Sequence, residues 1–354
     1  MITMIISIFS MCFRKVLFPG IALLCVAAVS IAQSAAVSPV ALGDARFQGA
    51  TEDWTTPALG TSHLIPIRPV EMVDNSHSGY TLELLQMQWR LGDPFDLYVM
   101  KPKGVKKPPV ILYLFSFSSD TDLFKNDAFQ QEVTKDGFAA VCFVSALSGH
   151  RFHDRPMKEW FISELQESLA ESAHDVQMIL NFLAGRGDFN MDEVGMIGHG
   201  SGGSIGILAS AVDPRIKVLD VLDPWGDWPT WMASSPVILL ENERREYVAP
   251  EFLKKAEMLE PVDWLPKVQA RKFRFQDAVY ETRTPKVAKE KLRAAAPPGT
   301  AFVFYKDLEE LQVAFPKDSM NLGWIEHELS MLPQTAGPPA SHPSAAQAAT
   351  VSNK

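Results

Sequence analysis

Runs of consecutive apolar residues alternate along this chain with segments of helical periodicity, and this alternation constrains the fold more than any other feature. A run that is apolar throughout predicts a strand buried on both faces of a sheet. Strands of this kind connected by helices form a mostly parallel sheet with helices on both sides. The runs lie at 110–115, 138–144, 194–198, 216–222, 271–275 and 301–305. The sequence therefore predicts a doubly wound α/β fold.

The segments between these runs supply the helices. The longest spans about 157–184, where apolar residues recur every three or four positions and so form one buried face. Pro156 suits its first turn and Gly185 its end. Further helices are expected at about 124–135, 201–211, 286–296 and 320–332, and two leading strands at 80–89 and 95–100.

The first 32 residues have the plan of an export signal. Arg14 and Lys15 precede an apolar run from Val16 to Ile31, and Ser30 and Ala32 stand at positions −3 and −1 of a cleavage site. The run is short for a membrane span. We expect residues 1–32 to be removed on export to the periplasm or the exterior, which leaves no stable membrane span.

The rest of the chain divides into three parts. We expect an N-terminal extension at 33–79, one domain at 80–332 with an inserted cap at about 224–266, and a disordered tail rich in Pro, Ala and Ser at 333–354. The formal net charge of −9 argues against nucleic acid as the main partner. A small-molecule ligand or substrate is the expected partner, and no cofactor or metal is expected.

A glycine-rich turn follows the run at 194–198. Residues 194–203 read Val-Gly-Met-Ile-Gly-His-Gly-Ser-Gly-Gly, which predicts a strand, a sharp turn and the start of a helix. The turn matches neither glycine-rich phosphate motif. It resembles the nucleophile elbow of the α/β-hydrolase superfamily, most closely in dienelactone-hydrolase-like and acyl-esterase members. This resemblance covers about 80–332 and implies an α/β-hydrolase fold and hydrolysis of an ester or related acyl bond.

The turn departs from the superfamily at the nucleophile. With Gly198 and Gly202 as the flanking glycines, Gly200 occupies the nucleophile position and keeps the turn without a reactive side chain. Ser201 is then the first residue of the helix, with its amide rather than its hydroxyl facing the pocket. In the alternative frame Ser201 is the nucleophile, and His199 takes a place that requires a small residue. Both frames remain open from the sequence.

The partners of a catalytic triad are also irregular. The resemblance places the acid after the run at 271–275, where Glu281 stands four residues before Pro285 and Asp277 is the alternative. The expected histidine after the last run is missing. A displaced base could come from His150 or His153, which follow the run at 138–144.

The same loop carries Arg151 and Arg155, which could bind an anionic ligand. Alternatively, the loop is a salt-bridged lead into the long helix. Backbone amides at Ser116 or Phe117, together with that of Ser201, could form an oxyanion site.

Tryptophans mark the start of the predicted cap. Trp225, Trp228 and Trp231 form an aromatic pocket wall in one interpretation and pack the cap onto the body in the other.

Two functions therefore stand at this point. The first is an exported hydrolase of an ester or related acyl bond with non-standard catalytic residues. The second is a catalytically degenerate hydrolase-fold protein that binds a small ligand or partner.

Overall fold

The computed structural model describes residues 51–90, 92–115, 121–147, 164–314 and 321–333. The predicted signal segment, the disordered tail and the loop at 149–156 lie outside these residues. So do Ser116 and Phe117. In the described part, no helix is both long and apolar enough to cross a membrane.

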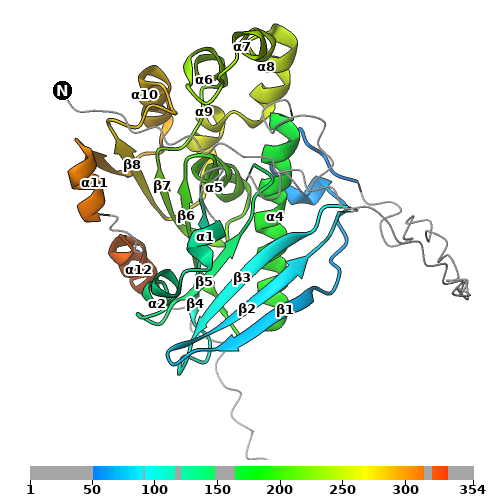
Figure 1. The fold of residues 1–354 in the computed structure, drawn as a ribbon, viewed down its shortest axis with the longest axis vertical. Coiled ribbons are helices and arrows are strands. Elements are labelled where there is room, and N and C mark those ends of the chain that lie inside the picture. Colours follow the sequence, from blue (N-terminus) through cyan, green and yellow to red (C-terminus); the bar gives the residue numbers. More distant parts are fainter. Residues whose placement is uncertain (1–50, 91, 116–120, 148–163, 315–320, 334–354) are drawn as a thin grey trace, which may run out of the picture. The chain divides into compact units, whose positions relative to one another are not determined.

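The described residues contain one nine-stranded sheet, in the order β1-β2-β3-β5-β4-β6-β7-β8-β9 (Figure 1). Pairing is antiparallel from β1 through β3 to β5 and parallel from β5 to β9. The predicted mostly parallel α/β sheet is thereby confirmed. The strands are β1 Val70–Ser76, β2 Tyr80–Met87, β3 Phe95–Pro102, β4 Pro109–Leu114, β5 Ala139–Phe143, β6 Asn190–His199, β7 Ile216–Leu222, β8 Lys272–Ala278 and β9 Ala301–Tyr305.

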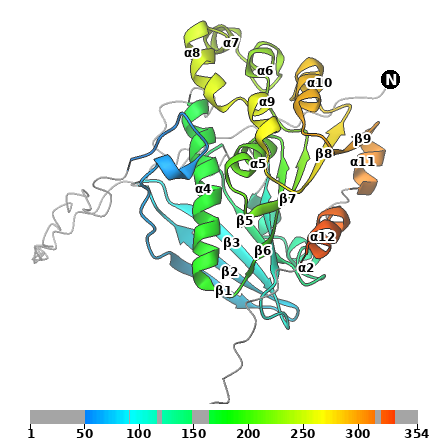
Figure 2. The same ribbon diagram turned by 180° about the vertical axis from the view of Figure 1, so that it is seen from behind.

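Helices cover both faces of this sheet, as Figures 1 and 2 show from opposite sides. Those outside the inserted segment are α1 Thr121–Phe124, α2 Asp127–Glu132, α4 Leu165–Arg186, α5 Ser201–Val212, α10 Lys286–Ala295, α11 Leu308–Ala314 and α12 Gly323–Ser330, with the 3-10 turn η2 Leu59–Thr61. The segment between β7 and β8 folds into α6 Trp228–Ser234, α7 Glu241–Tyr247, α8 Pro250–Ala256, η3 Glu257–Leu259, α9 Pro261–Trp264 and η4 Leu265–Lys267.

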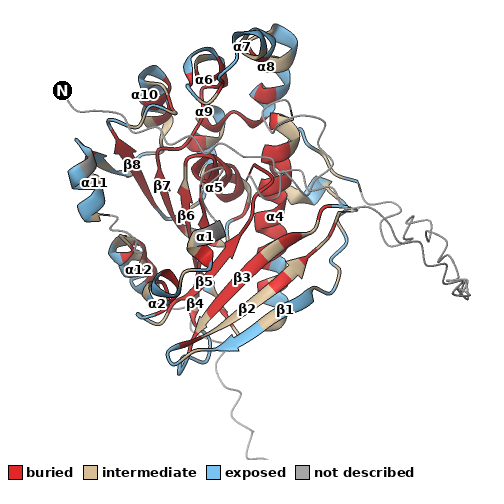
Figure 3. Ribbon diagram, in the orientation of Figure 1, coloured by how far each residue is buried: buried red, intermediate tan, exposed pale blue. Residues whose placement is uncertain are grey.

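The apolar runs are buried because their two faces meet different helices. Successive side chains of a strand point to opposite faces. In β4, Val110 and Leu112 belong to the cluster that includes α4 and α5, whereas Ile111 and Tyr113 belong to the cluster that includes α2 and α12. Figure 3 shows the central strands and α4 as the most buried elements.

The structure corrects several expected elements. The extension before residue 80 contains strand β1, in which Glu71 and Asp74 interrupt the apolar pattern that predicts a buried strand. Within the range of the expected helix at 124–135, the structure has the shorter helix α2, and α1 ends at Phe124, where that range begins. Asn126 caps α2 by accepting a hydrogen bond from the Phe129 amide at 3.0 Å. Helix α4 ends at Arg186, beyond Gly185, because Gly187 adopts the left-handed conformation (φ 73°) that terminates it. Helix α11 was not expected, and α12 is shorter than predicted.

A buried ion pair fastens the residues before β1 onto α4. The guanidinium of Arg90 binds both carboxylate oxygens of Glu52, at 2.5 and 2.6 Å, and His174 of α4 lies 2.7 Å from the same carboxylate. Burial raises the pKa of Glu52, but hydrogen bonds from Arg90 and His174 outweigh it and hold the pKa at about 2. This part of the extension therefore belongs to the packed body.

Candidate active site

The glycine turn lies where β6 passes into α5, at the carboxyl end of the sheet. Gly200 separates the last residue of β6 from the first residue of α5, with φ 56° and ψ −120°. Its amide donates to the Leu222 carbonyl of β7 at 2.9 Å, and its own carbonyl accepts from the Trp225 amide at 3.3 Å. Residues with side chains rarely adopt this conformation. The strained position of the turn is therefore occupied by Gly200.

The flanking glycines are required by close packing of the backbone. A Cβ atom on Gly198 would lie 2.5 Å from the Gly202 carbonyl oxygen, and one on Gly202 would overlap the Leu114 carbonyl at the end of β4. Ser201 has a fully buried side chain at the start of α5. This spacing matches the frame in which Gly200, and not Ser201, stands between the two close-packed glycines.

His199 ends β6 beside the turn and is partly exposed. Burial and, to a smaller extent, the positive charge of Arg283 lower the pKa of His199 to about 4, against the raising effect of Glu281. The imidazole is therefore uncharged at neutral pH. Glu281, one of the two expected acids, lies close enough to His199 for its negative charge to act on the pKa of this histidine.

Glu281 is held by a local partner. The amide and guanidinium of Arg283 each donate to its carboxylate at 2.7 Å. Burial raises the pKa of Glu281, but Arg283 outweighs this effect and the pKa stays below its ordinary value. Glu281 is therefore a half-buried carboxylate that is ionised at neutral pH.

Asp277, the alternative acid, lies in a buried ion cluster at the ends of β7 and β8. The ammonium of Lys289 from α10 lies 2.9 Å from Asp277 and 2.7 Å from Asp223, and also donates to the Ala278 carbonyl at 2.8 Å. Arg293, one turn later on α10, binds the other oxygen of Asp277. Because two cations occupy this carboxylate, it is not available to orient an imidazole.

Asp223 is the second carboxylate of this cluster, and its own backbone is strained. Its φ is 46°, and its carboxylate accepts from the Ala278 amide at 3.0 Å. Burial raises the pKa of Asp223 to about 6, against the lowering effect of Lys289. No sequence motif marks Asp223, Lys289 or Arg293 as site residues. The available signal is that Asp223 directly follows a predicted strand, which is where pocket residues of such sheets lie.

The tryptophans of the inserted segment are core residues. Trp225 and Trp228 are 2% and 1% exposed and both contact Trp231, with ring centroids 4.9 and 5.9 Å apart. The indole nitrogen of Trp228 donates to the Leu259 carbonyl at 3.2 Å. This burial favours packing of the cap onto the body over the ligand contact that the aromatic-wall interpretation expects.

A buried carboxylate anchors the inserted segment. Glu260 accepts hydrogen bonds from the amides of Asp227 and Trp228 at 2.7 and 2.6 Å, at the start of α6. Burial raises the pKa of Glu260 to about 7, although these amide hydrogen bonds favour its charged form. Glu260 thus supports the left-handed backbone of Asp227 (φ 54°) across a gap of more than thirty residues.

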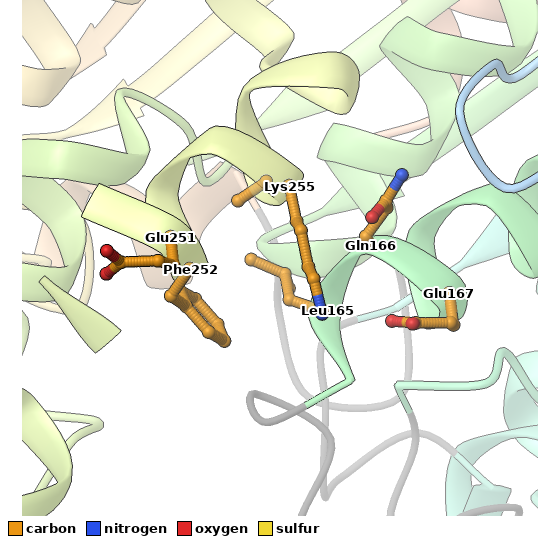
Figure 4. A pocket seen from close by; sticks show the side chains of 7 residues that line it. Leu165, Gln166, Glu167, Glu251, Phe252 and Lys255 are labelled. Atoms are coloured by element: carbon orange, nitrogen blue, oxygen red, sulfur yellow. The ribbon is translucent and has the colours of Figure 1, made fainter. Parts of the chain in front are cut away.

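Two hollows lie among the described residues of the inserted segment. A groove of about 630 Å³ runs between α6, α8, α9 and Lys291 of α10. A crevice of about 190 Å³ separates the start of α4 from α8, lined by Leu165, Gln166, Glu167, Glu251, Phe252, Lys255 and Ala256 (Figure 4). Neither hollow is lined by the glycine turn.

Several expected site residues lie outside the described residues. These are Ser116, Phe117, His150, Arg151, His153 and Arg155. Among the described residues that follow β9, the one histidine is His327, and it is exposed on α12. No group of three His, Cys, Asp or Glu side chains in the described part is placed to hold a metal ion.

Comparison with known proteins finds similarity in structure. No protein-family model matches the chain, and no curated protein matches it by sequence. The acetyl xylan esterase from Paenibacillus sp. R4 superposes with a TM-score of 0.57 at 15% identity, over 76% of this chain and 90% of the esterase. The S-formylglutathione hydrolase from Agrobacterium tumefaciens gives 0.52 at 14% identity, over 73% and 99%. Acetyl xylan esterase 1 from Thermoanaerobacterium sp. JW/SL YS485 gives 0.52 at 14%, over 69% and 82%.

Proposed function

Since the chain has the α/β-hydrolase fold, we propose that it is an exported small-molecule-binding protein in which serine-hydrolase chemistry has been lost. The ligand site we propose is the carboxyl end of the sheet, around the glycine turn. In open α/β sheets this is where ligands bind. Fold alone does not decide between an enzyme and a binding protein, so the residues at the turn must decide.

The observation that carries the proposal is the conformation of Gly200. A nucleophile must present its side chain from the strained position of the turn, with a base within hydrogen-bond reach. Here that position has no side chain, and the adjacent hydroxyl of Ser201 is buried in α5. Asp277 supports the same conclusion because Lys289 and Arg293 hold its carboxylate.

The ligand we propose carries a carbonyl or carboxylate group. The start of α5 directs backbone amides toward the turn, and a helix N-terminus favours negative charge. The net charge of −9 makes a nucleic acid an unfavourable partner. Export by the basic and apolar segment at 14–32 would bring the protein into contact with ligands outside the cytoplasm.

The test combines labelling, turnover and binding. We expect no fluorophosphonate adduct on the purified protein and no release of p-nitrophenolate from p-nitrophenyl acetate above the buffer rate. We expect 1-naphthyl acetate to raise the unfolding temperature while remaining intact. Strong labelling of the wild-type protein that disappears in Ser201→Ala would show that Ser201 is a nucleophile and would overturn the proposal.

A second candidate is an ester hydrolase that uses non-standard residues. The observation that favours it is the uncharged imidazole of His199 near the carboxylate of Glu281. A neutral imidazole can accept a proton from water, although a pKa of about 4 makes it a weak base at neutral pH. Turnover that survives in Ser201→Ala and is lost in His199→Gln would select this candidate.

A further inference from the structure

The two edges of the sheet differ in how they are protected. An edge strand exposes unpaired main-chain groups, and proteins discourage unwanted pairing there with charged side chains, prolines or bulges. The edge strand β1 has Glu71 and Asp74 and a break in register between Glu71 and Val73. The edge strand β9, at the other side, reads Ala-Phe-Val-Phe-Tyr and has no charge or proline. Its edge is therefore suited to pairing.

Strand β9 also exposes aromatic surface. Phe302 and Phe304 are 42% and 49% exposed, and their rings are nearly parallel, with centroids 6.3 Å apart. They point to the same face of the sheet because they are two residues apart. Among the described residues, β9 pairs with β8 alone, so its outer edge has no strand partner beside these rings. On the opposite face of β9, Val303 and Tyr305 belong to the cluster that includes Leu311 of α11.

From these observations we propose that β9 is the interface between two copies of this chain, paired antiparallel about a two-fold axis at Val303. The sequence of β9 is symmetric about Val303, which has a phenylalanine on each side. Antiparallel pairing centred on Val303 places Phe302 of each copy opposite Phe304 of the other, on the same face. Aromatic pairs directly opposite each other stabilise antiparallel strands. A two-fold interface is necessarily self-complementary, and β9 meets that condition.

The exposed area predicts a weak dimer. Each phenylalanine side chain offers at most about 200 Å², so the two rings expose roughly 200 Å² together. Val313 of α11 is 79% exposed and Val287 of α10 is 53% exposed, on the two helices that flank β9. A standard interface buries about 800 Å² on each partner. We therefore expect a weak and transient dimer that forms only at the upper end of the protein concentrations tested.

The first test measures association by sedimentation velocity over a wide concentration range. We expect the wild-type protein to dimerise, and Phe302→Lys/Phe304→Lys to weaken association at least about tenfold. Met72→Lys is the matched control, because Met72 is 54% exposed on the opposite edge strand β1 and should not change association. A wild-type protein that stays monomeric, or a dimer unchanged in the double variant, would overturn the proposal.

A second test does not depend on the stability of the double variant. Facing residues of an antiparallel pair have Cβ atoms close enough for a disulfide. Val303 faces itself across the proposed axis, so Val303→Cys should form a covalent dimer under mild oxidation, whereas Met72→Cys should not. Cys142, the free cysteine of the described residues, is buried and should not interfere. Equal cross-linking of the two variants, or none in Val303→Cys, would contradict the two-fold pairing.

Discussion

The ammonium of Lys289 lies 2.9 Å from a carboxylate oxygen of Asp277, and both side chains are buried. Asp277 stands at the end of β8, where the resemblance to α/β-hydrolases places the acid of a catalytic triad. The ion pair makes this carboxylate part of the packing between α10 and the sheet. This state of Asp277 supports the proposed loss of serine-hydrolase chemistry.

Removal of this ammonium should destabilise the protein strongly. Lys289→Ala leaves Asp223 without a cation at hydrogen-bond distance and Asp277 with Arg293 alone. A buried charge deprived of its partner costs about 3–5 kcal/mol. Urea unfolding should show a loss of this size. The control is Lys135→Ala, whose exposed pair with Glu132 should change the free energy of unfolding by less than about 1 kcal/mol. Equal losses in the two variants would contradict a structural role for Lys289.

Gly200 should resist substitution by any residue with a side chain. Gly200→Ala places a Cβ on a backbone with φ 56° and ψ −120°, which costs about 1–3 kcal/mol. Gly185→Ala is the control, since Gly185 is exposed within α4 and a Cβ there meets nothing within 4 Å. That change should stabilise by about 0.5–1 kcal/mol. A Gly200→Ala protein as stable as the wild type in thermal unfolding would show that the turn is not strained.

His199 should make stability depend on pH in the acidic range. Its pKa is about 4 in the folded protein and 6.5 when unfolded, so unfolding takes up a proton between these values. The contribution of this imidazole to the free energy of unfolding is fully present above pH 6.5. It is lost as the pH falls to 4, by at most about 3 kcal/mol. His199→Asn should remove this part of the slope.

The measurement for His199 is the free energy of unfolding in urea at several pH values. His327→Asn serves as the matched control, because His327 is an exposed histidine on α12. Its pH profile should follow the wild type. If His199→Asn also follows the wild type, the lowered pKa of His199 in the folded protein is wrong.

Glu260 should hold the start of α6. In the wild type, the two carboxylate oxygens of Glu260 accept hydrogen bonds from the backbone amides of Asp227 and Trp228. Glu260→Gln replaces one of these oxygens with an amide nitrogen, so that one backbone N–H faces another donor. A buried donor left unpaired costs about 1–3 kcal/mol. Hydrogen exchange should accelerate in α6, whereas Glu257→Gln, on the exposed side of η3, should leave it unchanged. Unchanged exchange in Glu260→Gln would show that the anchor lies elsewhere.

The positions of the parallel strands along the chain could be predicted from the sequence, as could the turn between β6 and α5. The apolar runs of these strands leave no face for solvent, which predicts strands buried on both sides. Glycines at positions 198, 200 and 202 directly after such a run predict a tight turn from strand to helix. Strand β1 was missed because an edge strand is mostly solvated, so Glu71 and Asp74 interrupt the apolar pattern. Helix α11 was missed for the same reason, since most of its residues are exposed.

The sequence by itself determined that this chain forms an α/β sheet with a glycine-rich turn, because hydrophobic periodicity and glycine chemistry are local. The structure decided between the two frames of that turn, since Gly200 has the strained backbone with φ 56°. Only the tertiary structure decided the state of the polar residues. Asp223 and Lys289 are 66 residues apart in sequence and meet because β7 and α10 pack together. Burial then removes water from these groups, and the charge of each residue depends on partners that no local pattern identifies.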